Sequence, residues 1–147
     1  MVSLDRPIKF EEVDAANLVF FARYLAYAHE AMERFFAPLE GGYAGLILAR
    51  RIGLPAVRVE ADYAAPVRYG ETLRIETSVA RIGRRSATLR YRMFRAHDGV
   101  LAAELRHTVV TTDLVQTASV QMPEDVRALL SAHLEPDPSP AGAGPRG

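Results

Sequence analysis

The sequence contains no cysteine, which excludes disulfide bonds and a thiol nucleophile. It also lacks an excess of charge: 18 basic residues balance 18 acidic ones, so no electrostatic feature favours nucleic acid or an anionic membrane as a partner. No run approaches the ~20 consecutive apolar residues of a membrane span, and residues 1–10 lack the apolar core of a secretory signal. We therefore expect a cytoplasmic protein without nucleic-acid or membrane partners.

What the sequence does contain is one long apolar segment, residues 10–36, with the sequence FEEVDAANLVFFARYLAYAHEAMERFF. We expect a short strand over residues 7–13, a turn at residues 14–17, and then a helix of about five turns. Either Asp14 or Asn17 can cap that helix. Its apolar residues recur at helical spacing and predict a buried face: Phe21, Tyr24, Leu25, Ala28, Ala31, Met32 and Phe35.

From residue 56 onward the apolar period changes from that of a helix to that of a strand. Alternation predicts strands over residues 56–63, 72–79, 87–93 and 101–109, with an Asp98-Gly99 hairpin before the last. A brief helical segment over residues 43–51 precedes them, and a short helix over residues 123–133 follows. Strands with one polar face form an antiparallel sheet that packs its other face on something apolar, and the long helix is the obvious candidate.

These elements predict an α+β hotdog fold, in which a curved antiparallel sheet of about five strands wraps one long buried helix. The length of 147 residues suits a single domain with a real core. We expect that domain to span residues 1–134. Residues 135–147 are rich in Pro, Gly and Ala and predict a disordered tail.

Asp14 is the main candidate for chemistry, and the residues alone leave two interpretations open. An aspartate before a helix is most simply a capping or loop residue. The same position also places a carboxylate beside the free amides of a buried helix N-terminus, which pairs a nucleophile or base with an anion-stabilising dipole. Acyl-transfer chemistry through a tetrahedral intermediate needs that combination.

Signatures of other site classes are missing from the sequence. Residues 29–33 read HEAME, which lacks the final histidine of a zinc-binding H-E-x-x-H helix. The four histidines, at positions 29, 97, 107 and 133, show no ligand spacing. There is no G-x-G-x-x-G motif, no phosphate-binding P-loop and no G-x-S-x-G serine elbow. We therefore expect no metal and no redox cofactor.

Residues 14–21, DAANLVFF, resemble the entry to the helix in the 4-hydroxybenzoyl-CoA thioesterase family of hotdog enzymes. That family reads roughly D-x-A-G-hydrophobic-V-aromatic at this point and continues into an aromatic-rich helix. Asn17 stands where the family has glycine, and Asn tolerates left-handed backbone geometry better than most residues. The resemblance extends through the Ala65-Pro66 and Gly70-Glu71 turn to residues 84–86, where Glu71 replaces the family's aspartate.

The resemblance implies a role for five residues. Asp14 falls on the catalytic aspartate, and the backbone N–H of Phe21 falls where the thioester carbonyl is polarised. Arg84 and Arg85 fall on a basic pair that anchors the nucleotide phosphates of CoA; an ordinary solvated turn is the simpler interpretation of the two arginines. His29 falls at a pocket position, where its surroundings look more like those of the 1,4-dihydroxy-2-naphthoyl-CoA thioesterases, although a core or interface histidine is an equal alternative.

The resulting expectation is an acyl-CoA thioesterase that hydrolyses a hydroxyaryl or hydroxynaphthoyl thioester, with Asp14 as nucleophile or general base and CoA as part of the substrate. We expect at least a homodimer and favour a homotetramer, because hotdog relatives build each site across a dimer interface. The alternatives are a non-catalytic acyl-CoA or acyl-carrier binding module and a general short-chain acyl-CoA thioesterase. A hydratase is disfavoured, since its D-x-x-x-x-H pattern needs histidine where this chain has Val19.

Overall fold

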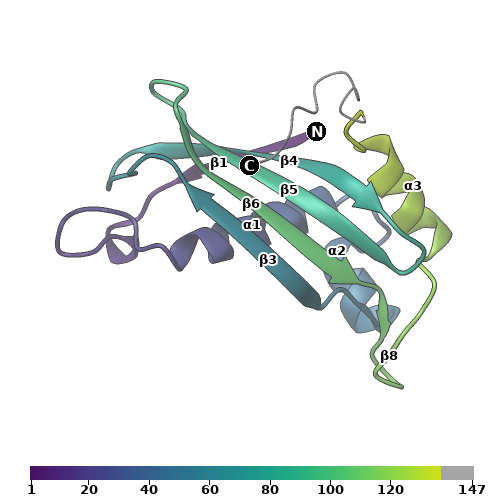
Figure 1. Ribbon diagram of the computed structural model, residues 1–147. Coiled ribbons are helices and arrows are strands. Elements are labelled where there is room, and N and C mark those ends of the chain that lie inside the picture. The colour runs from purple at the N-terminus through teal and green to yellow at the C-terminus, as the bar shows by residue number, and fades with distance from the viewer. Residues whose placement is uncertain (137–147) are drawn as a thin grey trace, which may run out of the picture.

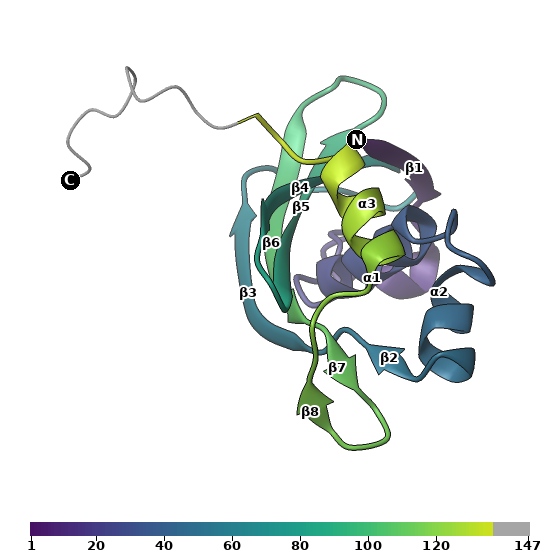
Figure 2. The ribbon, with the colours of Figure 1, turned by 90° about the vertical axis from the view of Figure 1, so that its right-hand side faces the viewer.

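The computed structural model describes residues 1–136 and has the predicted α+β hotdog architecture (Figure 1). Five antiparallel strands form one sheet in the order β1-β4-β5-β6-β3. The sheet curves around a central helix, α1, which lies on its concave side (Figure 2). The strands are β1 (Val2–Pro7), β3 (Ala56–Tyr63), β4 (Thr72–Ile82), β5 (Ser86–Arg95) and β6 (Leu101–Val110).

The other elements are short and surround this unit. A second sheet, β2-β7-β8, was not expected from the sequence, because strands of two residues carry no readable period. The remaining bounds are η1 (Phe10–Glu12), α2 (Gly42–Ala44), η2 (Gly45–Ala49), β2 (Ile52–Gly53), β7 (Thr112–Asp113), β8 (Ala118–Ser119) and α3 (Glu124–Ala132). The predicted helical segments at residues 43–51 and 123–133 are therefore confirmed.

Helix α1 (Arg23–Phe35) is 13 residues long and amphipathic. It ends where the chain approaches Pro38 and a left-handed Gly41 at φ 73°. Its buried residues follow the i, i+3, i+4, i+7 rule and are Tyr24, Tyr27, Ala28, Ala31, Met32 and Phe35. They pack against alternate inward-facing residues of the sheet, such as Leu89, Tyr91 and Met93 of β5, all fully buried.

Two expectations at the start of the chain were wrong. The first strand occupies residues 2–7 rather than 7–13, because its ladder with β4 ends at the Pro7–Thr72 pair and Lys9 to Glu12 fold into a 3-10 turn. The helix begins at Arg23 with Ala22 as its N-cap, so neither Asp14 nor Asn17 caps it. Residues 14–18 form a loop of their own instead, since the Asp14 side chain bonds within that loop.

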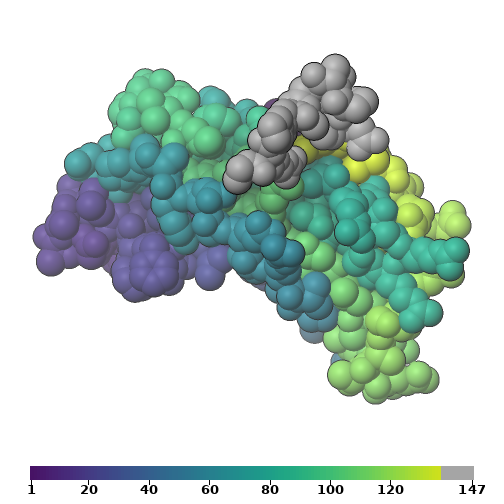
Figure 3. Space-filling view, in the orientation of Figure 1, coloured from purple at the N-terminus to yellow at the C-terminus, as the bar shows by residue number. Residues whose placement is uncertain are grey.

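The prediction that Phe21 and Leu25 belong to the buried face was also wrong for the single chain. Their exposed fractions are 62% and 48%. Helix α1 packs mainly against β1 and β4, on one half of the sheet, so its flank toward β3 stays uncovered. The β3 strand itself is exposed at nearly every residue, including Val57 at 62%, and it lies along the front surface of the molecule (Figure 3).

The C-terminal end bears on the predicted domain boundary. Glu135 is still held to the sheet: Ser78 Oγ donates to its carboxylate over 2.5 Å, and Arg90 pairs with it. Residues 137–147, most of the predicted tail, lie outside the described residues, so the division at residue 134 stays a prediction. None of the helices in residues 1–136 has the length and apolar character needed to cross a bilayer.

Candidate functional site

The Asp14 loop is a tight turn between Val13 and Val19, which form an isolated antiparallel bridge. Oδ1 of Asp14 accepts hydrogen bonds from the backbone N–H groups of Ala16 (2.8 Å) and Leu18 (3.2 Å). These bonds fix the orientation of the carboxylate, while Oδ2 accepts none from the described part of the chain and the residue is exposed. The loop therefore presents one oriented and unoccupied carboxylate oxygen to solvent.

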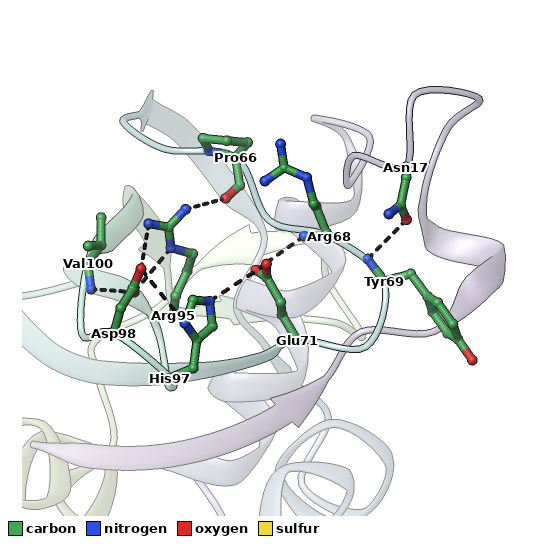
Figure 4. A network of polar contacts seen from close by, with 9 residues as sticks. All are labelled: Asn17, Pro66, Arg68, Tyr69, Glu71, Arg95, His97, Asp98 and Val100. Atoms are coloured by element: carbon green, nitrogen blue, oxygen red, sulfur yellow. Dashed lines mark hydrogen bonds and ion pairs between the residues drawn. The ribbon is translucent and has the colours of Figure 1, made fainter.

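Asn17 completes this turn with φ at 60°, the left-handed geometry that its position in the motif requires. Its Oδ1 accepts from the Tyr69 backbone N–H over 3.3 Å, which ties the loop to the segment between β3 and β4 (Figure 4). That segment is held in turn by Arg95, which donates to the Pro66 carbonyl and pairs with Asp98. The asparagine thus supplies both the backbone geometry and an anchor for the loop.

The N-terminus of α1 offers backbone donors close to the Asp14 loop. Within residues 1–136 the N–H groups of Phe21 and Ala22, which directly precede the first turn of α1, donate no hydrogen bond, and the helix has no side-chain cap. The Phe21 carbonyl is instead engaged, because the Tyr63 hydroxyl donates to it over 3.1 Å. Free amides at a helix N-terminus are a ready site for negative charge.

A hollow of about 320 Å³ opens at this point between α1 and the β3 edge. The rings of Tyr24 and Tyr63 meet edge to face, 5.2 Å apart, and form part of its wall. Burial raises the pKa of Tyr24 to about 12, with smaller contributions from Tyr63 and Glu71, so its hydroxyl stays protonated at neutral pH. The complete lining is Leu18, Val19, Phe21, Tyr24, Tyr63, Ala64, Ala65 and Pro66.

A second hollow, of about 210 Å³, lies further along the same seam between α1 and β3. Its lining is mostly apolar, with two imidazoles, His29 from α1 and His107 from β6. His29 is itself exposed and donates from Nε2 to Glu33 over 3.1 Å. The structure therefore places His29 at a pocket, about two helical turns beyond Phe21.

Arg84 and Arg85 lie in the β4–β5 turn and line a third hollow, of about 370 Å³, together with Gln121. The turn is rigidly supported: the Arg85 carbonyl accepts from Thr111, and the Arg84 carbonyl accepts from Met122. Both arginines are exposed. The Asp14 loop, however, lies beside the start of β4, and the arginines follow its end, so the length of β4 separates them by roughly 35 Å.

One chain thus brings Leu18 of the Asp14 loop, Phe21 and His29 to the hollows between α1 and β3, but it does not bring Arg84 and Arg85 there. Sequence reasoning missed two residues of the seam, Tyr63 and His107. A signal for both was present in the sequence, since each is a polar-tipped residue in an alternating series of otherwise apolar side chains. No group of three or more His, Cys, Asp or Glu within residues 1–136 is arranged to hold a metal ion.

Comparison with known proteins identifies the family of the chain. Residues 8–130 match the model of the thioesterase-like superfamily. A 1,4-dihydroxy-2-naphthoyl-CoA hydrolase from Synechococcus elongatus is 35% identical over 103 residues, covering 69% of this chain and 76% of the relative. A hydrolase of the same name from another Synechococcus species is 28% identical over 144 residues, covering 92% and 95%.

Among solved structures, a thioesterase superfamily protein from Jannaschia superimposes with a TM-score of 0.85 at 28% identity, covering 92% of this chain and 94% of that one. The residues that match the family model include the Asp14 loop, α1 and four of the five strands of the sheet, β3, β4, β5 and β6. By its sequence and by its fold, this chain belongs to the thioesterase-like superfamily.

Proposed function

We propose that this protein is an acyl-CoA thioesterase that hydrolyses an aromatic, hydroxylated acyl-CoA to the free acid and CoA. The observation that carries the proposal is the combination of the oriented Asp14 carboxylate with the unoccupied N–H groups of Phe21 and Ala22 at the start of α1. Thioester hydrolysis is the activity in the names of relatives across most of the chain's length. Those names also specify an aromatic acyl group.

The chemistry follows from charge development on the thioester carbonyl. As the carbonyl carbon becomes tetrahedral, its oxygen gains negative charge, which the Phe21 N–H and the positive end of the helix dipole stabilise. An oxyanion-hole donor of this kind is worth roughly 10²–10³ in kcat. The carbon–sulfur bond then breaks, and CoA leaves as the thiolate, which takes up a proton.

Asp14 can act in two ways. As a nucleophile, its carboxylate oxygen bonds to the carbonyl carbon and displaces CoA, giving a mixed anhydride that water hydrolyses to the acid and regenerated Asp14. As a general base, it accepts a proton from a water molecule as that water adds to the carbonyl. Both routes need the free carboxylate oxygen, and both give the same products.

The acyl group would extend from the Phe21 end of the seam toward His29. The walls between them are mostly apolar and suited to an aromatic ring, and they include Leu25, Ala28 and Val59. A neutral imidazole at His29 can exchange a hydrogen bond with a ring hydroxyl, whereas a straight alkyl chain has no such group. This supports a hydroxyaryl substrate over an aliphatic one.

We further propose that the working form is at least a homodimer joined at the β3 edge. Apolar side chains on β3 and on the neighbouring flank of α1 are exposed in the single chain, among them Val57, Phe21 and Leu25. A two-fold axis beside β3 would pair the β3 strands of the two protomers in antiparallel fashion.

This arrangement would also complete the site. The β4–β5 turn of one protomer would lie at the same end of the joined sheet as the Asp14 loop of the other, so the partner's Arg84 and the partner's Arg85 would hold the CoA phosphates. A homotetramer remains an expectation beyond this.

The decisive experiment measures thiol release from a panel of aryl- and alkyl-CoA thioesters. We expect hydrolysis of hydroxyaryl-CoA by the wild type and a loss of at least 10²-fold in kcat for Asp14→Asn, with CoA binding retained. Asp5→Asn is the matched control, because Asp5 is an exposed aspartate on β1 with no place in the seam. A near-wild-type rate for Asp14→Asn would remove Asp14 from the mechanism.

The same panel separates the alternatives. An acyl-CoA or acyl-carrier binding module would bind the thioesters without releasing thiol. A general short-chain thioesterase would give equal kcat/KM for hydroxyaryl and alkyl substrates, and His29→Leu would then leave that ratio unchanged.

A further inference from the structure

His107 is a polar residue on the face of β6 that packs toward α1. Its neighbours at alternate positions, Leu105 and Val109, are buried and apolar. Across the sheet it pairs with Leu89 of β5 and with Val59 of β3. A polar side chain on such a face costs free energy unless each of its polar atoms finds a partner. Nδ1 of the ring has a partner within the chain, whereas Nε2 makes no hydrogen bond with any residue of the described range 1–136.

The partner is Tyr91 of β5, whose hydroxyl lies 3.3 Å from Nδ1 of His107. Tyr91 is fully buried, and His107 is the one hydrogen-bonding partner of its hydroxyl among the described residues. If Nδ1–H donated to the tyrosine oxygen, the tyrosine's own proton would be buried without an acceptor, at a cost of about 1–3 kcal/mol. The favoured arrangement has Tyr91 O–H donating to Nδ1, which places the proton of the neutral imidazole on Nε2.

His107 also lines the 210 Å³ hollow, and His29 faces the same hollow from α1. Burial lowers the pKa of His107, and a protonated His29 would lower it further, so the folded protein favours the neutral His107 ring. The His29 Nε2–H is already committed to Glu33. In a neutral His29 this leaves Nδ1 as an acceptor, so the two rings differ in role: one can donate and the other can accept.

We propose that His107 is a specificity-determining residue, whose Nε2–H donates a hydrogen bond to a hydroxyl oxygen on the aromatic ring of the acyl group. Tyr91 is a positioning residue that holds the imidazole in the donating tautomer. A hydroxyl between the two rings donates its own proton to His29 while it accepts from His107. The inference rests on the proposed aryl-CoA substrate and names the groups that recognise its hydroxyl.

The test compares 4-hydroxybenzoyl-CoA with benzoyl-CoA, which differ by the hydroxyl alone. We expect His107→Leu to reduce the wild-type preference for the hydroxylated substrate by about tenfold in kcat/KM, the value of one hydrogen bond in a closed site. His107→Gln restores an N–H donor and is expected to recover part of the preference. His97→Leu, which changes an exposed histidine in the β5–β6 turn, is the matched control.

Tyr91→Phe separates positioning from packing. In the wild type, nitrogen-15 NMR of the His107 ring should give the chemical shifts of a protonated Nε2 and an unprotonated Nδ1. Removing the tyrosine hydroxyl should shift these toward a mixture of tautomers and lower the hydroxyl preference while the fold is kept. Unchanged ring shifts in Tyr91→Phe would overturn the positioning role.

Binding measurements keep this inference distinct from the proposed activity. Calorimetry with both thioesters on the Asp14→Asn variant, with and without His107→Leu, reports recognition without turnover. A hydroxyl preference that disappears with His107→Leu supports the inference even if the wild type releases no thiol. A preference that is absent, or that persists in His107→Leu, overturns it and leaves the thioesterase activity to be judged from thiol release alone.

Discussion

The two edge strands of the sheet differ in how completely the rest of the chain covers them. On β1, residues alternate between exposed and half-buried, and Arg6 reaches inward to pair with the buried Glu12 and with Glu30 of α1. Its guanidinium also lies over the Tyr27 ring, 4.5 Å from the centroid. On β3, nearly every residue is exposed, and the ion pair between Arg58 and Glu60 is in solvent.

The difference follows from the off-centre position of α1. The helix packs mainly on the β1 and β4 side, and that half of the molecule is closed by its own contacts. The β3 half is left with exposed apolar residues and with the hollows that contain the candidate site. We infer that one edge serves stability, and the other serves a partner copy and a substrate. Each of the following predictions tests that division, and they run from the largest expected effect to the smallest.

The largest effect is expected from Glu12→Gln at the β1 edge. Glu12 is 5% exposed, and although burial raises its pKa, the hydrogen bonds from Arg6 and from the Lys9 backbone outweigh that effect and lower it. Removing its charge leaves Arg6 without its buried partner, at a cost of about 3 kcal/mol and roughly 10 °C in Tm. Glu60→Gln on β3 is the control and should cost less than about 0.5 kcal/mol. Equal losses in thermal unfolding would show that the edges do not differ.

The next effect concerns assembly at the β3 edge. Val57→Asp places an unpaired charge in the proposed interface, which should weaken dimerisation by roughly 100-fold, or about 2.7 kcal/mol. Light scattering after size-exclusion chromatography, over a range of concentrations, measures the change. Ser3→Asp on β1 is the control, because Ser3 is exposed on the edge that we expect to remain free. A Val57→Asp variant with unaltered mass at all concentrations would place the interface elsewhere.

A smaller effect is expected when Arg84 and Arg85 are both changed to Ala. Loss of two charge-assisted contacts should raise KM for acyl-CoA by about tenfold with little change in kcat. The difference from the wild type should shrink at high salt, since screening already weakens contacts between exposed charges and phosphate. Comparison of CoA with 3′-dephospho-CoA locates the contact, and Arg106→Ala on β6 is the control. Equal binding of both nucleotides by variant and wild type would exclude the assignment.

The smallest effect is a pH dependence of stability due to His107. Its pKa in the folded protein is lowered by burial and by His29, so the unfolded chain binds the proton more readily. The stabilising contribution is complete above the unfolded pKa of about 6.5 and is lost as pH falls from there through the folded pKa. Lowering the pH from 7.5 to 5.5 should therefore reduce the Tm of the wild type more than the Tm of His107→Phe, which thermal unfolding at each pH measures. Parallel pH profiles for the two proteins would contradict this.

Much of the fold could be predicted because its signals are periodic. Residues 56–110 alternate over long strands, and the structure confirms all four. The start of α1 could not be read in the same way, since residues 18–21 are apolar and resemble a continuing helix. The Asp14 carboxylate accepts hydrogen bonds from the backbone of Ala16 and Leu18 and closes a turn there. The helix therefore begins only at Arg23.

The site was predicted unevenly for a related reason. Asp14, Phe21 and His29 belong to one contiguous stretch of sequence, and Phe21 and His29 line the two hollows between α1 and β3. The catalytic and binding roles of all three residues stay predictions. His107 is 78 positions beyond His29, and only the curvature of the sheet brings the two to the same hollow. The spacing of residues along the sequence does not show which side chains become neighbours when strands from distant parts of the chain are ordered in a sheet. For the same reason, the sequence did not show that the length of β4 separates Arg84 and Arg85 from Asp14.

The open β3 edge also has a consequence for the newly made chain. In the single chain, this edge strand of eight residues exposes unpaired backbone N–H and C=O groups, a template on which any other extended segment can add. The strand carries its own protection, because Arg58, Glu60 and Asp62 alternate with its apolar residues and place charges of both signs beside any incoming strand. Replacing these charges with neutral residues should leave the fold of each chain intact while making it aggregate at expression levels that the native sequence tolerates.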